Sequence, residues 1–275
     1  MFPNFLVIGA MKAGTTSLHR YLCEHPQVFM PGEKELDFFV AEKRWSRGPS
    51  WYEQQFAAAA DAIAVGEASP TYTMHPEFTG VPGRIAELLP ETRLIYAVRH
   101  PIERIRSHYL HEVEKGRERA PIGRALVTDF RYLDASRYAT QLEQYLNCFS
   151  ADRVLVITTE QLLDDRAATV GRVLAFLGVD SDWSNKYVLD REFHRTSDKR
   201  VRRPFVEAAL RVPGTRALAG LAPRPMRRLA SRGVDADRAT AIPEAVEARL
   251  RAELRDDVAA LRAYLGEGFD GWGIA

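Results

Sequence analysis

Two shortages in the sequence exclude whole classes of protein. The 275 residues include only two cysteines, Cys23 and Cys148, which cannot form a disulfide framework and whose spacing matches no zinc-binding pattern. No apolar run is long enough to span a lipid bilayer. A strand-like run begins at Phe5 and leaves no room for a signal peptide before it. We therefore expect a cytoplasmic protein.

The sequence also lacks an excess of charge of either sign. Its 38 Lys and Arg residues nearly balance 37 Asp and Glu residues, so the net charge of +1 gives no electrostatic argument for nucleic-acid binding. One section differs, because from Lys199 to Arg232 ten basic residues stand against a single acid, Glu207. For residues 199–240 we expect a helical cover or a substrate-side insertion. Its basic face can attract an anionic substrate, contact an anionic membrane through 199–232, or simply face solvent.

Predicted buried strands alternate with amphipathic helices along the chain. Short apolar runs predict strands at residues 5–9, 63–67, 93–98 and 154–158. Apolar residues at helical spacing follow these runs, and a last helix with a leucine stripe is predicted from Pro243 to Leu265. This alternation predicts an α/β protein with a P-loop-like, three-layer αβα arrangement, a central mostly parallel sheet and a helical C-terminal part. We expect one domain over residues 1–275.

The turn after the first predicted strand has the composition of an anion-binding loop. It lies between Gly9 and Gly14, contains Lys12, and leads into a helix start that is rich in hydroxyl groups. The first backbone N–H groups of a helix lack internal partners, and the helix dipole favours negative charge there. We predict that this loop binds a phosphate or sulfate group. The alternative is an ordinary strand–helix turn that happens to contain a lysine.

This loop differs from the nucleotide-binding P-loop in the position of its lysine. The Walker pattern places lysine directly after the second glycine, but here Thr15 follows Gly14 and Lys12 precedes it. The strand at 93–98 also ends in Arg99 rather than in the aspartate that holds magnesium in P-loop NTPases. We therefore predict a site without a metal, and a P-loop kinase is the less favoured alternative.

A second anion site is predicted where the strand at 93–98 ends. Arg99 follows this strand, and Ser107 lies eight residues later, two turns into the next predicted helix. Both side chains can face the crevice at the carboxyl ends of the strands, where open α/β sheets bind ligands. Arginine binds phosphate with two parallel hydrogen bonds, so this pair suits a further phosphate. The alternative is a helix whose basic face is solvated.

The segment at residues 33–39 combines acidic residues with aromatic rings. It reads Glu-Lys-Glu-Leu-Asp-Phe-Phe and has no helical period. A carboxylate held near apolar rings has a raised pKa and suits general-base work. Considered alone, a solvated loop charge is the simpler interpretation of these acids.

Together, two of these motifs resemble the donor site of the PAPS-dependent sulfotransferases. The donor of that family is 3′-phosphoadenosine 5′-phosphosulfate (PAPS), and its product is 3′,5′-ADP (PAP). Residues 12–17 resemble the family's 5′-phosphosulfate loop. Residues 99–107 resemble its 3′-phosphate motif, whose Arg and Ser fall on Arg99 and Ser107. The resemblance is closest to the heparan-sulfate and bacterial branch, and it implies binding of PAPS without a metal.

A third motif resembles the acceptor side of heparan-type 3-O-sulfotransferases. Residues 33–39 are similar to the segment that carries their catalytic glutamate, which falls on Glu35. The resemblance implies in-line transfer of a sulfuryl group to a hydroxyl, less commonly an amine, of a carbohydrate, glycolipid or secondary metabolite. Glu35 would act as the general base, and Lys12 would stabilise the leaving phosphate.

The resemblance assigns further residues by their positions in the motifs. Donor-binding residues are expected at Lys12, Ala13, Gly14, Thr15, Thr16, Ser17, Arg99 and Ser107, with a looser match at Lys199 and Arg200. Acceptor contacts are expected at Glu35, Asp37, Phe38, Glu67 and Tyr138.

Two positions depart from the family pattern. His100 stands where Asp or Asn is common, which we do not expect to disturb phosphate binding. Ala68 stands where heparan enzymes often carry a functional lysine, and this counts against a heparan-like acceptor. Glu67, Asp37 and His100 are the other candidates for the base. A non-catalytic protein that binds a nucleotide or anionic lipid is the alternative from another class.

Overall fold

A five-stranded parallel sheet forms the centre of the protein, in a computed structural model that describes residues 1–183, 200–202, 231–233, 240–266 and 268–275. In spatial order, its strands are β2 (Val28–Phe29), β3 (Ala64–Ala68), β1 (Phe5–Gly9), β4 (Arg93–Val98) and β5 (Val154–Thr158). Every residue of β1 and β3 is buried, as in sheets covered on both faces, where strands read as continuous apolar runs. All four predicted strands are present.

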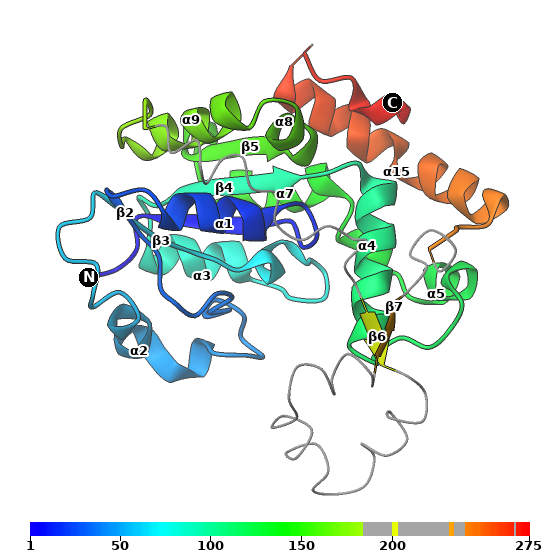
Figure 1. The fold of residues 1–275 in the computed structure, drawn as a ribbon, viewed down its shortest axis with the longest axis horizontal. Coiled ribbons are helices and arrows are strands. Elements are labelled where there is room, and N and C mark those ends of the chain that lie inside the picture. The colour runs from blue at the N-terminus through cyan, green and yellow to red at the C-terminus, as the bar shows by residue number, and fades with distance from the viewer. Residues whose placement is uncertain (184–199, 203–230, 234–239, 267) are drawn as a thin grey trace, which may run out of the picture.

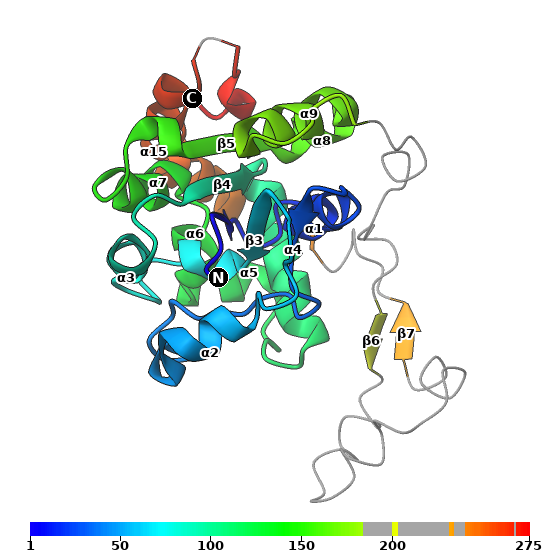
Figure 2. The same ribbon diagram turned by 90° about the vertical axis from the view of Figure 1, so that its left-hand side faces the viewer.

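Helices cover both faces of this sheet (Figures 1 and 2). One face is covered by α1 (Thr15–Cys23) and α9 (Arg166–Leu177), which pack on Val7 and Ile95. The other is covered by α3 (Val81–Leu88) and α7 (Tyr138–Leu146), which pack on Leu6 and Tyr96. The predicted three-layer α/β arrangement is therefore confirmed.

The remaining helices surround these layers. They are α2 (Gly48–Gln54), α4 (Pro101–Glu114), α5 (Ile122–Thr128), α6 (Arg131–Asp134), α8 (Thr159–Asp164) and α15 (Glu244–Leu265). Short 3-10 turns are η1 (Trp45–Arg47), η2 (Pro70–Thr73), η3 (Ala151–Arg153) and η5 (Gly271–Gly273). Among the described residues, no helix is both long and apolar enough to cross a membrane.

The helix α15 packs where its leucine stripe predicts. Leu250, Leu254 and Val258 are buried in one cluster with residues of α4 and α5. The carboxylate of Asp257 accepts hydrogen bonds from the first N–H groups of α7, at 3.0 Å from Ala139 and 2.8 Å from Thr140. The C-terminal helix thus caps α7 from outside and fixes it against the sheet.

The predicted basic cover over residues 199–240 lies mostly outside the described residues. Its described parts are two short strands, β6 (Arg200–Arg202) and β7 (Ser231–Gly233), which pair antiparallel close to α4 (Figure 1). These six residues are extended where we expected helix.

Candidate active site

The loop between β1 and α1 presents an open helix N-terminus. Gly14 caps α1 with a left-handed backbone (φ 82°), and no side chain caps the helix. Only glycine adopts this conformation without strain, so the sequence position of Gly14 follows from the turn. The buried Ala13 donates its N–H back to the carbonyl of Ala10 at 3.1 Å, which closes the turn. Ser17 donates its N–H to the carbonyl of Gly14 at 3.0 Å, so the N–H groups of Thr15 and Thr16 are the ones open to an anion.

Lys12 lies in this loop with a left-handed backbone of its own, at φ 73°. Residues other than glycine rarely adopt this region, and the surrounding structure must hold them there. The side chain is half-buried, and its charge acts on His108 of α4. The lysine is thus positioned at the junction of the loop and α4.

The two residues of the predicted 3′-phosphate motif lie on the neighbouring strand and helix. Arg99 directly follows β4, and its side chain reaches Glu103 at 3.8 Å. Ser107 lies on α4 with 7% of its surface exposed. The helix begins at Pro101, where His100 accepts a hydrogen bond from the N–H of Ile102 at 3.2 Å. Histidine therefore serves as the N-cap residue at this departure from the family pattern.

The strand β4 pairs with β1, so these two motifs share one edge of the sheet. The N–H of Ala10 donates to the carbonyl of Ala97 at 2.5 Å, which joins the loop to the end of β4. The adjacent α8 begins beside the loop, because a Cβ atom at Gly14 would lie 3.6 Å from Oγ1 of Thr159. Ligands of open α/β sheets bind at such a carboxyl edge.

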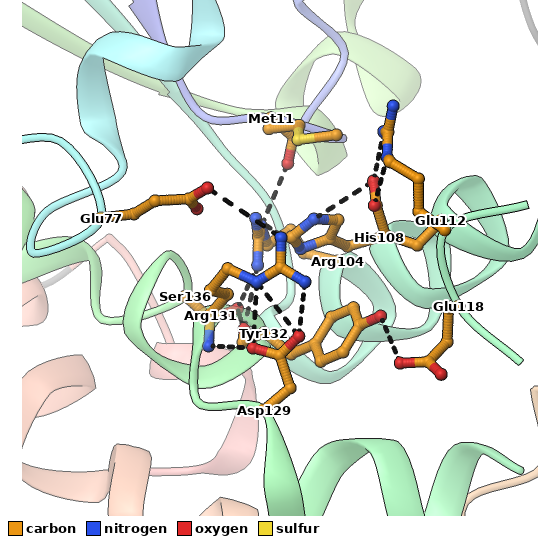
Figure 3. Close-up of polar contacts among 11 residues, drawn as sticks. Met11, Glu77, Arg104, His108, Glu112, Glu118, Asp129, Arg131, Tyr132 and Ser136 are labelled. Carbon is orange, nitrogen blue, oxygen red and sulfur yellow. Dashed lines mark hydrogen bonds and ion pairs between the residues drawn. The ribbon is translucent and has the colours of Figure 1, made fainter. Parts of the chain in front are cut away.

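Arg104, to which the sequence assigned no role, joins α4 to the loop between β1 and α1. Arg104 is fully buried, and its Nε donates to the carbonyl of Met11 at 3.0 Å (Figure 3). It also donates to the carbonyl of Tyr132 and to Oγ of Ser136, and it lies beside His108 of α4. Helical spacing gave no signal for its burial, because the residues three and four positions later, Ser107 and His108, are polar.

The acceptor segment, which we define as residues 35–39, is bound to the residues that follow β3. The N–H of Glu35 donates to the carbonyl of Ala68 at 3.1 Å, and that of Asp37 donates to Oγ of Ser69 at 2.9 Å. Glu35 and Asp37 both have left-handed backbones, at φ 63° and 50°. Because β3 pairs with β1, this segment lies at the same edge of the sheet as the loop that contains Lys12.

The two carboxylates of the acceptor segment differ in accessibility. The side chain of Glu35 is 53% exposed and pairs with Lys34 at 3.1 Å. Asp37 is mostly buried and pairs with Lys43 at 2.6 Å, and it also accepts a hydrogen bond from Thr71. Of these two, Glu35 presents its carboxylate to solvent.

Glu67, another predicted acceptor contact, is buried and hydrogen-bonded inside the protein. It is 2% exposed and accepts hydrogen bonds from Oγ of Ser69 at 2.6 Å and from the hydroxyls of Tyr72 at 2.5 Å and Tyr52 at 3.4 Å. Burial raises the pKa of Glu67 to about 7, although the hydroxyl donors counteract part of this rise. Three hydroxyl donors therefore surround this buried carboxylate.

Phe38 and Tyr138 are also in the interior. Phe38 is fully buried and stacks on Tyr52 with ring centroids 4.3 Å apart. Tyr138 is fully buried on α7, where its ring packs 6.1 Å from Tyr96 and 5.9 Å from Trp272. Both side chains are buried in this structure, and their expected contact with the acceptor stays a prediction.

The last predicted donor residues are not described in full. Lys199 lies outside the described residues, and Arg200 is described only as part of the backbone of β6. In the described part of the chain, no group of three or more His, Cys, Asp or Glu residues could hold a metal ion.

Comparison with known proteins identifies the family. The family "Sulfotransferase domain" matches residues 2–205. Heparan sulfate glucosamine 3-O-sulfotransferase 6 of Mus musculus is 30% identical over 280 residues, which cover 98% of this chain and 74% of that protein. Its Homo sapiens counterpart is 31% identical over 207 residues, or 72% of this chain and 57% of that protein. This chain thus spans only part of the length of these relatives.

A solved structure shows the same fold. The crystal structure of a sulfotransferase from Alicyclobacillus acidocaldarius has a TM-score of 0.72 and 24% identity and covers 99% of both chains. The predicted family membership is confirmed, and neither a kinase nor a non-catalytic protein agrees with these matches. The chain belongs to the PAPS-dependent sulfotransferase family.

Proposed function

We propose that this enzyme transfers a sulfuryl group from PAPS to a hydroxyl group of a carbohydrate, with Glu35 as the general base. One observation carries the proposal. An open helix N-terminus with Lys12 follows β1, the Arg99 and Ser107 pair follows β4, and the exposed carboxylate of Glu35 lies on a segment bound to the end of β3, so all three share the carboxyl edge of the sheet. This arrangement offers two anion sites on one side and a proton acceptor on the other.

The residues at this edge fit the two charged ends of PAPS. At the 5′ end, the N–H groups after Gly14, the hydroxyls of Thr15 and Thr16, and the ammonium of Lys12 suit the phosphosulfate. At the 3′ end, Arg99 and Ser107 suit the additional phosphate. PAPS carries a 3′-phosphate that an ordinary adenosine 5′-phosphate lacks, and the second anion site would select for it.

The proposed reaction is an in-line displacement at sulfur. The acceptor oxygen forms a bond to sulfur while its proton passes to the Glu35 carboxylate, and the bond from sulfur to the bridging phosphate oxygen breaks. The electron pair of that bond leaves with PAP, so negative charge develops on its 5′-phosphate. Lys12 and the helix N–H groups stabilise this charge more strongly in the transition state than in the ground state.

Accessibility favours Glu35 over the other carboxylates as the base. Glu67 is enclosed by hydroxyl donors, and Asp37 is held by Lys43 and Thr71. His100 uses Nδ1 to cap α4, and burial lowers its pKa. A general base must come within hydrogen-bond reach of the acceptor proton, and of these four groups Glu35 is the one most open to solvent.

The choice of a carbohydrate acceptor rests on the relatives that act on heparan sulfate. Glycolipids, secondary metabolites and amines are the alternatives. An anionic membrane contact through residues 199–232 and a cytoplasmic location remain predictions from the sequence.

Two measurements test this function. Isothermal titration should show tighter binding of PAP than of 5′-AMP, and equal affinities would refute the 3′ site. Labelled PAPS is then incubated with heparan sulfate oligosaccharides, neutral oligosaccharides, glycolipids and phenolic compounds, and products are read by mass spectrometry. Sulfated oligosaccharide is the expected product. Sulfation of only the non-carbohydrate acceptors would refute the proposed acceptor class.

A further inference from the structure

Arg104 is a fully buried cation surrounded by neutral partners. Its guanidinium donates to the carbonyls of Met11 and Tyr132, each at 3.0 Å, and to Oγ of Ser136 at 3.0 Å. Its Nη2 lies 3.2 Å from Nδ1 of His108. Burial and the charge of Arg104 hold the pKa of His108 well below its usual range, so this ring is neutral and accepts the hydrogen bond.

No carboxylate in the described part of the chain lies within ion-pair distance of Arg104. Glu112, on the same helix, lies 3.9 Å from Nε2 of His108 (Figure 3) and pairs with the half-exposed Arg117 at 2.6 Å. An arginine keeps its proton in a protein, so the positive charge is present in the interior. A buried charge without a counter-ion is costly, and a ligand anion bound nearby would offset part of that cost.

The hydrogen bond from Arg104 to the Met11 carbonyl orients the peptide group between Met11 and Lys12. This peptide is trans, so its carbonyl and its N–H point in opposite directions. Because the Met11 carbonyl is directed inward at Arg104, the N–H of Lys12 is directed away from it. The left-handed backbone of Lys12 then continues the turn into the start of α1, as in the concave N–H arrangements that bind anions.

The helix that carries Arg104 also carries the 3′ site. Ser107 is one helical turn from Arg104, and Arg99 lies two residues before the start of the same helix. A shift of α4 would therefore move the 3′-phosphate ligands and the Met11 carbonyl together. We propose that Arg104 is a positioning residue that holds the phosphosulfate loop in its anion-binding conformation and couples it to the 3′ site. This inference rests on the proposed function.

The test separates the two ends of the donor. Binding of PAP, 3′-AMP and 5′-AMP is measured by titration for the wild type, Arg104→Met and Arg104→Lys. In Arg104→Met, affinity for PAP and 5′-AMP should fall about tenfold to a hundredfold, the value of a hydrogen bond from a charged group. Affinity for 3′-AMP should stay near that of the wild type, and Arg104→Lys should recover part of the loss.

Two matched variants control for a merely structural effect. Ser136→Ala removes another contact of Arg104 but leaves its bond to Met11, so it should lower stability without changing the ratio of PAP to 3′-AMP affinity. Arg99→Ala should show the opposite selectivity, with loss of PAP and 3′-AMP binding and retention of 5′-AMP binding. For the sulfuryl transfer itself, Arg104→Met should raise the KM for PAPS and lower kcat, with the KM for the acceptor unchanged.

The outcomes distinguish this inference from the proposed function. If the folded Arg104→Met protein keeps the wild-type ratio of PAP to 3′-AMP affinity, the positioning role is refuted. If the wild type itself does not prefer PAP to 5′-AMP, the proposed function fails instead.

A measurement without substitution covers the case in which Arg104→Met does not fold. In wild-type protein with ¹⁵N-labelled arginine, the slowest-exchanging Nε–H signal is expected from the fully buried Arg104. This signal should shift when PAP or 5′-AMP is added. An unchanged signal at saturating PAP would refute the inference.

Discussion

Oγ of Ser69 lies 2.6 Å from the carboxylate of Glu67 and donates a hydrogen bond to it. The same oxygen accepts the backbone N–H of Asp37 at 2.9 Å. The buried end of β3 is thus connected through one hydroxyl to the acceptor segment that carries Glu35. The position of the exposed Glu35 carboxylate therefore depends on the buried carboxylate of Glu67.

We expect Ser69→Ala to impair turnover without weakening donor binding. The substitution removes the hydroxyl that accepts the Asp37 N–H and donates to Glu67. The acceptor segment then loses one of the hydrogen bonds that hold it at the end of β3. A small misplacement of a reacting group is costly, and kcat should fall about tenfold or more. The control is Ser150→Ala at the opposite end of the sheet. Weaker PAP binding with an unchanged kcat would contradict this role.

We expect Glu67 to make the stability of the protein depend on pH. Its pKa is about 7 in the folded protein, above its ordinary value of 4.5. The folded state therefore holds this proton more tightly, and the stabilisation is complete below pH 4.5 and lost as the pH rises through 7. The shift corresponds to about 3 kcal/mol.

Denaturant unfolding at several pH values measures this effect. Glu67→Gln has no proton to lose, so its free energy of unfolding should fall less than that of the wild type between pH 5 and pH 8. Equal pH dependence in both proteins would show that Glu67 titrates normally. The pH profile of turnover should keep its form in this variant if Glu35 is the base.

We expect Glu35→Gln to abolish most turnover and to leave PAP binding intact. A positioned general base contributes about a hundredfold to ten-thousandfold to a rate, and glutamine cannot accept the proton. The matched control is Glu33→Gln, since Glu33 is an exposed acid that pairs with Arg44. Near-normal turnover of Glu35→Gln with a hydroxyl acceptor would assign the base to another residue.

We expect Lys12→Ala to slow sulfuryl transfer by about a hundredfold to a thousandfold, because it removes a positive charge aimed at the leaving phosphate. The loss should be in kcat more than in PAP affinity, since the charge on the phosphate grows during the reaction. Lys115→Ala, at the exposed end of α4, is the control. An equal loss in both variants would point to a general electrostatic effect.

We expect Gly14→Ala to destabilise the protein by about 1 kcal/mol and to weaken PAP binding. A Cβ atom has room there, with Oγ1 of Thr159 at 3.6 Å, so the cost comes from the left-handed backbone at φ 82°. Gly83→Ala is the matched control, because Gly83 lies in α3 with nothing near its Cβ position. That variant should gain stability by a similar amount.

Four of the five strands of the central sheet, the glycine turn after β1 and the family were predicted from the sequence alone. A buried parallel strand requires a run of apolar residues, and the turn from β1 into α1 requires glycine at a left-handed position. Arg99 and Ser107 could be located because their spacing follows from one strand end and one helix. Each of these features depends on residues close together in the chain, where backbone geometry leaves few choices.

Only the tertiary structure decided which polar residues lie inside. Arg104 and Met11 are 93 positions apart. Glu67 is linked to the acceptor segment by the hydrogen bond between Ser69 and Asp37, which are 32 positions apart. Glu67, Phe38 and Tyr138, which the sequence suggested as acceptor contacts, are all buried, and the sequence did not show this. A charge or ring in a strand end or helix carries no local sign of burial, because its environment is set by elements that join it only when the sheet and its helices assemble.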